Sequence, residues 1–120
     1  MSDDIKLDSA AAVEVAAFCW PAAAGQSWNA PLQGGPYAYL NDDEAGEMLR
    51  GFYPDDFNDL HRAAAVLVER GYGQVFDDCF LHEAENGEGA KMLGTISRVA
   101  AAPADDWARA IVATVREVKR

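Results

Sequence analysis

Apolar side chains recur with helical spacing in the middle of the chain, between residues 57 and 70. When the residues are placed at 100° intervals, one broad apolar arc forms opposite the charged positions. This arc consists of Leu60, Ala63, Ala64, Leu67 and Val68. Pro54 fits a first helical turn, and the acidic residues after it offset the positive end of the helix dipole. Because Gly71 is typical of a helix end, we predict a helix that packs on the core and ends at Arg70.

A second helix is predicted near the start of the chain. It begins at a cap from Asp8 or Ser9 and ends at Trp20, before a proline. Glu14 is its only charged residue. A helix that is apolar on all sides is either covered on both sides within its own chain or used in self-association. Residues 9–20 are therefore a candidate surface for a homo-oligomer.

A third helix is predicted from Pro103 to Val118 at the end of the chain. Its apolar arc consists of Trp107, Ala110, Ile111, Thr114, Val115 and Val118. Arg109, Arg116 and Arg120 line the opposite side of this helix.

Strands are predicted from short runs rich in aromatic and β-branched residues. Residues 21–36 contain three prolines and three glycines, which indicates loops with one short strand near residues 27–32. Residues 37–40 predict a strand with Tyr37 and Tyr39 on one face. Residues 74–82 and 90–99 predict two more strands, joined by a hairpin turn within residues 83–89.

A short helix is predicted between the first strands and the central helix. Residues 41–44 have the sequence of an acidic helix cap, and Gly51 follows Arg50 as a stop. The predicted order is thus helix, one or two strands, two helices, two strands and a helix. Such an order is typical of an α+β fold in which a small, mainly antiparallel sheet is covered by helices, in the manner of an α-β-α sandwich. At this length we predict a single domain over residues 1–120, with residues 1–7 frayed.

The charge of the chain is strongly acidic and unevenly placed. The net charge is −10, and residues 1–60 hold 11 acidic and 2 basic residues. Seven of these acids lie in residues 41–60, against Arg50 alone. Negative charge disfavours binding to nucleic acid, which requires neutralised phosphates, and it favours a partner protein with a basic surface.

The sequence predicts a cytoplasmic protein that does not cross a membrane. No run of 18 apolar residues is present. Residues 10–24 are apolar, but the residues before them are acidic, whereas a secretory signal begins with basic ones.

No catalytic or metal-binding motif is present, and we predict neither enzymatic activity nor a cofactor. Two cysteines, Cys19 and Cys79, do not make a disulfide framework in a domain of this size. A zinc site that adds His61 and His82 to them is disfavoured, because Cys79 and His82 point to opposite faces of the predicted strand.

Three segments resemble the phage ABA sandwich family of small phage and prophage proteins. The first is a helix that ends near an aromatic residue, over residues 13–20. The second is a helix start with Phe52, Pro54 and Asp55, which leads to Ala64, Val66 and Val68. The third consists of Ala101 and Pro103, followed by a helix that contains residues 108–113. The chain departs from the family in Asp55 and Asp56, which replace a serine or threonine, and in residues 42–51, which have the character of an insertion. The resemblance implies an α/β sandwich of phage origin without an inherited active site.

Two functional hypotheses follow from these observations. In the first, the protein is a non-enzymatic phage accessory protein that binds and inhibits a host defence protein through an acidic surface with aromatic anchors. The candidate partner-binding residues are Asp42, Asp43, Glu44, Glu47, Asp55, Asp56, Tyr37, Tyr39 and Tyr53. In the second, an oligomer binds a small phosphorylated or nucleotide ligand. The candidate ligand-binding residues are Arg109, Arg116, Arg120 and Trp28.

Overall fold

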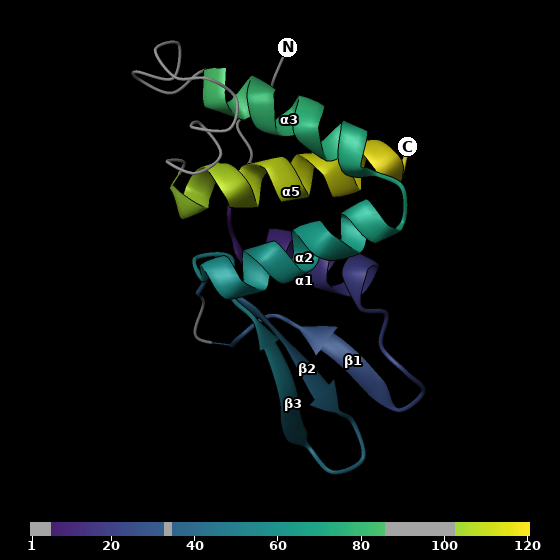
Figure 1. Cartoon of the computed structure of the whole chain (residues 1–120). Coiled ribbons are helices and arrows are strands. Elements are labelled where there is room, and N and C mark those ends of the chain that lie inside the picture. Colours follow the sequence, from purple (N-terminus) through teal and green to yellow (C-terminus); the bar gives the residue numbers. More distant parts are fainter. Residues whose placement is uncertain (1–5, 33–34, 86–102) are drawn as a thin grey trace.

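The computed structural model describes residues 6–32, 35–85 and 103–120, and of residues 81–85 only the backbone. These parts form a small α+β fold with a three-stranded antiparallel sheet (Figure 1). Its elements are α1 (Ser9–Cys19), β1 (Gln26–Asn29), β2 (Ala38–Asp42), β3 (Glu47–Phe52), α2 (Phe57–Glu69), α3 (Gly73–Glu85) and α5 (Ala104–Val118).

The helices pack together into one body, and the sheet projects from it (Figure 1). α5 contacts α1, α2 and α3, and the molecule measures 51 × 31 × 28 Å along its principal axes. The described helices therefore lie on one side of the sheet, and the predicted arrangement with helices on both faces is not seen. The described order also differs from the predicted one, because all three strands precede α2.

The central helix α2 forms where its sequence predicts, but it begins at Phe57, so Pro54 precedes the helix and does not lie in its first turn. The carboxylate of Asp56 caps it by accepting a hydrogen bond from the Asn58 backbone N–H at 2.8 Å. At the other end Gly71 has φ of +88°, and the Tyr72 N–H donates to the Leu67 carbonyl at 2.9 Å. This is a Schellman motif, in which the residue after the helix must adopt a left-handed conformation.

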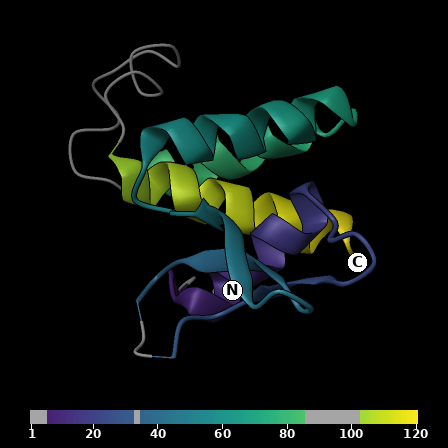
Figure 2. The ribbon, with the colours of Figure 1, turned by 90° about the horizontal axis from the view of Figure 1, so that it is seen from below.

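The apolar helix α1 is covered on both sides within the chain. It packs against α2 and α5 on one side and against β1 and β2 on the other (Figure 2). Its buried residues are Ala11, Ala12, Val15, Ala16 and Cys19. The composition of α1 is therefore explained without self-association through residues 9–20.

The sheet is a meander with two distinct faces. Trp28, Leu40 and Arg50 lie opposite one another across the strands, on what we call the inner face. This face contacts the helical body, since Trp28 donates its indole N–H to the Trp20 carbonyl at 2.6 Å. The outer face carries the alternate residues, Ser27, Asn29, Tyr39, Asn41, Met48 and Gly51.

A β-bulge interrupts the pairing of β2 with β3. Leu40 pairs with Arg50 and Asn41 pairs with Met48, so Leu49 is an extra residue on β3. Met48 and Leu49 are 58% and 46% exposed.

The short helix predicted over residues 41–50 is wrong, because this segment is the turn and second strand of a β-hairpin. The Asp42 carboxylate does accept backbone hydrogen bonds, from Glu44 at 3.0 Å and Ala45 at 3.2 Å. The same side-chain chemistry caps helices and closes turns. Gly46, with φ of +70°, completes the turn.

The strand predicted over residues 74–82 is also wrong, because the segment is the helix α3. Phe76 and Phe80, four residues apart, lie on one helical face with ring centroids 5.7 Å apart, and Gln74 donates to Asp78 at 3.0 Å. Aromatic content favoured a strand, but the four-residue spacing was the better signal. Of the predicted hairpin, residues 83–85 belong to α3, and the turn at residues 86–89 and the strand at residues 90–99 lie outside the described residues.

Candidate interaction surface

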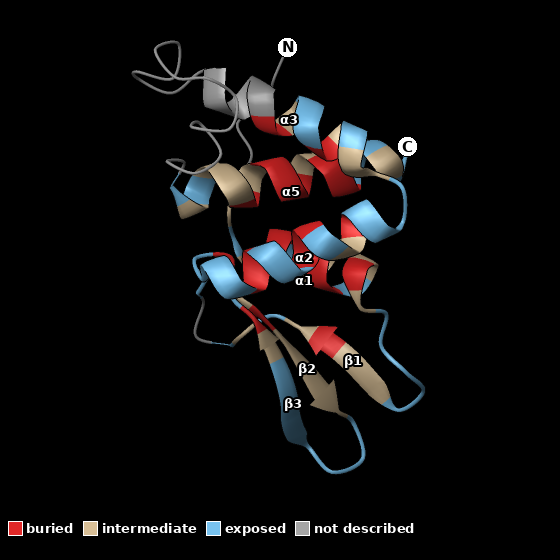
Figure 3. Cartoon of the chain, viewed as in Figure 1, coloured by how far each residue is buried: buried red, intermediate tan, exposed pale blue. Residues whose placement is uncertain are grey.

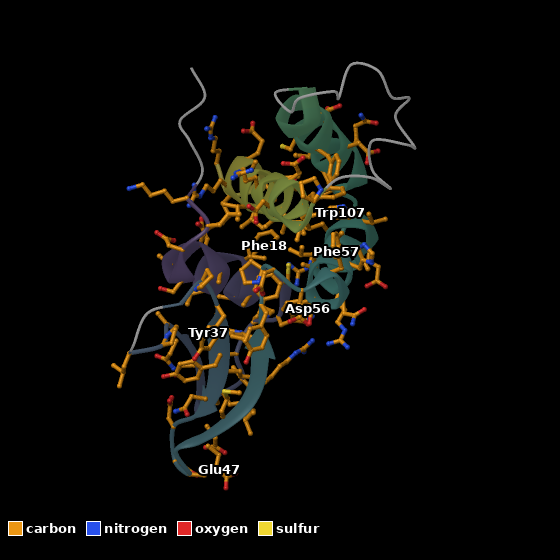
Figure 4. All side chains as sticks on the ribbon, turned by 90° about the vertical axis from the view of Figure 1, so that its left-hand side faces the viewer. Phe18, Tyr37, Glu47, Asp56, Phe57 and Trp107 are labelled. Atoms are coloured by element: carbon orange, nitrogen blue, oxygen red, sulfur yellow. The ribbon has the colours of Figure 1, made fainter. Side chains whose placement is uncertain are left out.

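A pair of stacked tyrosines lies where the outer face of the sheet meets the helices. The rings of Tyr37 and Tyr53 are 5.1 Å apart and inclined by 24° (Tyr37 is labelled in Figure 4). The Tyr53 ring lies over Gly51, where a Cβ atom would come within 2.6 Å of its Cε2 atom. Tyr39 lies opposite Gly51 on the neighbouring strand. The structure therefore brings the three predicted tyrosines together on one side of the sheet.

Four of the predicted acidic residues gather at the tip of the β2–β3 hairpin. Asp42 closes the turn, and Asp43 accepts a hydrogen bond from the Ser27 hydroxyl at 2.9 Å. Glu44 and Glu47 are exposed, and Glu47 marks the far end of the molecule in Figure 4.

The other two acids, Asp55 and Asp56, lie at the opposite end of the sheet. They belong to the turn that leads from β3 into α2, and both are exposed. β3 is six residues long, which separates the two acidic groups by about 20 Å. The six carboxylates thus form two groups rather than one patch, and Figure 4 shows one member of each group, Glu47 and Asp56, well apart.

None of these six acids takes part in a salt bridge with a described residue. Arg50, the base that is closest in sequence, lies on the inner face with its guanidinium 4.5 Å from the centre of the Trp20 ring. That side chain therefore points away from the outer face. Figure 3 shows that the sheet is mostly exposed or half-buried, in contrast to the buried interior of the helical body.

Asp59 anchors the tyrosine pair, a role that the sequence reading missed. It is only 8% exposed, and it accepts a hydrogen bond from the Tyr53 backbone N–H at 2.9 Å. The sequence reading counted Asp59 as a charge that offsets the helix dipole. Its position three residues after the cap, Asp56, is the place from which an acidic side chain reaches back across a helix start, and this signal was available.

The residues of the nucleotide hypothesis do not converge. Trp28 is buried on the inner face of the sheet, whereas the three arginines lie along α5. Each arginine has an ion-pair partner: Arg109 with Asp106 at 3.5 Å, Arg116 with Glu14 at 3.1 Å, and Arg120 with Glu117 at 3.5 Å.

An open hollow of about 260 Å³ lies next to Pro36 and Pro54, the sequence neighbours of the two stacked tyrosines. It is lined by Leu7, Pro36, Pro54, Asp55, Asp105 and Arg109. Burial raises the pKa of the neighbouring Asp106, with a smaller opposing effect from the Arg109 guanidinium. The hollow brings one predicted partner-binding residue, Asp55, next to one predicted ligand-binding residue, Arg109.

The Cys19 thiol is not an activated nucleophile. Burial raises the pKa of the Cys19 thiol to about 11, which keeps it protonated at neutral pH. The strand geometry used against a zinc site is wrong, because Cys79 and residue 82 are three positions apart on α3 and share a helical face. Within the described ranges, no three His, Cys, Asp or Glu side chains are grouped as metal ligands. The same ranges contain no helix long and apolar enough to span a membrane.

Comparison with known proteins gives no relative. No family model matches the chain, and neither a curated protein nor a solved structure is detectably similar to it. The resemblance to the phage ABA sandwich family therefore stays a prediction.

Proposed function

We propose that the protein is a non-enzymatic phage accessory protein that binds and inhibits a basic host protein. The binding surface is the outer face of the sheet with the acidic groups at its two ends. Tyr37, Tyr39 and Tyr53 supply the aromatic contacts, and the hairpin tip supplies the charge that steers a basic partner into place.

One observation carries this proposal: the six acidic residues around the tyrosines have no salt-bridge partner among the described residues. Elsewhere in the described chain four acids are paired, among them Glu14 with both Arg116 and Lys119, whereas others such as Glu69 and Asp105 are not. Carboxylates left uncompensated around half-exposed aromatic side chains are the pattern of a surface that awaits a cationic partner.

A charge-reversal variant of the hairpin tip tests the proposal. It combines Asp42→Asn with Glu44→Lys and Glu47→Lys. Asparagine keeps the acceptor that closes the turn, while no hydrogen bond to either glutamate side chain is seen, so the fold should be retained. The unaltered chain, used as bait in a bacterial lysate, should capture a protein, and the variant should bind this protein at least about tenfold more weakly.

The matched control places the same change in charge on the helical body. Glu69→Lys, Asp77→Lys and Asp78→Asn alter exposed positions on α2 and α3, and the control should bind as the unaltered chain does. Equal capture by both variants would show that the acidic tip is not the binding surface. The activity of the captured protein is then measured with and without the chain, and an unchanged activity would refute the inhibitory role.

A further inference from the structure

The outer face carries a continuous row of polar and aromatic side chains, which we call the outer track. It begins at the hairpin tip with Asp43, whose carboxylate is hydrogen-bonded to Ser27. Ser27 pairs with Asn41 across the strands, and Tyr39 follows two residues earlier on β2. The stacked rings of Tyr37 and Tyr53 come next, and the exposed Asp55 follows Tyr53 two residues later in the chain.

The outer track has a carboxylate at each end and phenol rings between them. Its length follows from that of the strands, about 20 Å, which corresponds to roughly six residues of extended peptide. Neither Asp43 nor Asp55 has a salt-bridge partner among the described side chains. The track therefore complements an extended segment that carries positive charge.

Of the two cationic side chains, arginine fits this surface better than lysine. Its planar guanidinium stacks on aromatic rings and binds carboxylates through two parallel hydrogen bonds, whereas an ammonium group is a strongly hydrated point charge. The chain itself uses the first arrangement twice, with Arg50 over Trp20 at 4.5 Å and Arg70 over Phe18 at 5.2 Å.

We infer that the outer track binds an extended, arginine-bearing segment of the partner protein. This inference rests on the proposed function and names the part of the partner that is recognised. Guanidinium groups stack on the tyrosine rings, and the carboxylates of Asp43 and Asp55 bind guanidinium groups at the two ends of the track.

Two blocked peptides, hexa-arginine and hexa-lysine, test the inference by titration calorimetry at physiological ionic strength. They carry equal charge, so long-range electrostatic attraction alone would bind them equally. Stacking on the tyrosines should make hexa-arginine bind about fivefold more tightly. In ¹⁵N NMR spectra of the labelled protein, the peptide should shift the amide signals of Tyr39, Asn41 and Gly51 but not those of α3.

Tyrosine variants show whether the preference comes from the rings. Tyr39→Leu and Tyr53→Leu should each reduce the ratio of the two affinities, and the double variant should reduce it further. Tyr39→Phe is the matched control, which keeps the ring and should keep the ratio. Both affinities are measured on the same variant, so a partial loss of folded protein lowers both equally and leaves their ratio unchanged.

Equal affinities for the two peptides would overturn the inference, and so would a preference that is undiminished in the double variant. If capture of the host protein still depends on the hairpin tip, such a result leaves the proposed function standing. If instead capture does not depend on the tip while the peptide preference is present, the proposed function fails and the track remains an arginine-binding surface.

Discussion

Gly51→Ala changes the tyrosine surface without removing any of its side chains. Gly51 lies within β3 and does not have a positive φ, so its backbone conformation is one that alanine can adopt. The new Cβ atom, however, would come within 2.6 Å of Cε2 and 3.1 Å of Cζ of Tyr53. Ordinary carbon contacts need about 3.5 Å, so the ring must move by about 1 Å.

The change in stability should be small, because two effects offset each other. The lost contact between Tyr37 and Tyr53 costs about 0.5–1.5 kcal/mol. Replacement of glycine by alanine within a strand stabilises the fold by about 0.5–1 kcal/mol, because the unfolded chain then has less conformational freedom to lose. The free energy of unfolding should therefore change by less than about 1 kcal/mol.

Urea unfolding measures this free energy, and ring proton NMR signals report the position of Tyr53. We expect a nearly unchanged unfolding midpoint, shifted ring signals for Tyr37 and Tyr53, and a reduced preference for hexa-arginine. Unshifted ring signals would refute the predicted clash. A loss of more than about 2 kcal/mol would mean that the aromatic pair stabilises the fold more than stacking energies allow.

Substitutions at three further residues test the packing described above. Asp59→Ala should destabilise the fold by about 1–3 kcal/mol because it leaves the Tyr53 N–H without an acceptor. Asp59→Asn keeps an acceptor and should destabilise the fold less than half as much. Equal losses of stability in urea unfolding would contradict this role of Asp59. The stability of the unaltered protein should fall as the pH rises from 9 towards 11. In the unfolded chain the Cys19 thiol ionises near its ordinary pKa of 9.0, whereas in the folded protein burial raises its pKa to about 11 and keeps it protonated. Cys19→Ala should lack that part of the decline, and parallel pH curves for the two proteins would count against a buried thiol. Trp28→Phe removes the hydrogen bond to the Trp20 carbonyl and should lower the melting temperature by several degrees, and an unchanged value would show that this bond contributes nothing net.

The helices α1, α2 and α5 could be predicted because their signals are local. Asp8 caps α1 as expected, and Gly71 ends α2 in the conformation that glycine favours. The strand that begins near residue 37 was also found from its aromatic alternation. These elements have periodicity, cap and stop signals that agree with one another.

The hairpin and α3 were misread because their local signals fit two structures. Asp42 accepts the same backbone hydrogen bonds in a turn that it would accept at a helix start. In α3, the residues Phe76 and Phe80 favour strands by propensity and are held in a helix by contact with Trp107 on α5. Such tertiary contacts are absent from any short window of sequence.

The sequence indicates which tyrosines and acids are candidates for the surface, but it does not predict how these residues are arranged in space. The tyrosines and acids were chosen by residue type, and the structure separates the acids into two groups because residues 47–52 form a strand and not a helix. Asp59 was overlooked because its role depends on Tyr53, which precedes the helix and is brought back to it by the turn.

The bulge at Leu49 has a consequence for how copies of this protein behave at high concentration. β3 is an edge strand, and its unpaired backbone groups and exposed Met48 and Leu49 could template the pairing of one copy with the next. The extra residue breaks the two-residue repeat that such stacking requires, and the like charges at the hairpin tip repel a second edge. The bulge and the charged tip therefore both oppose edge-to-edge pairing of β3 between two copies.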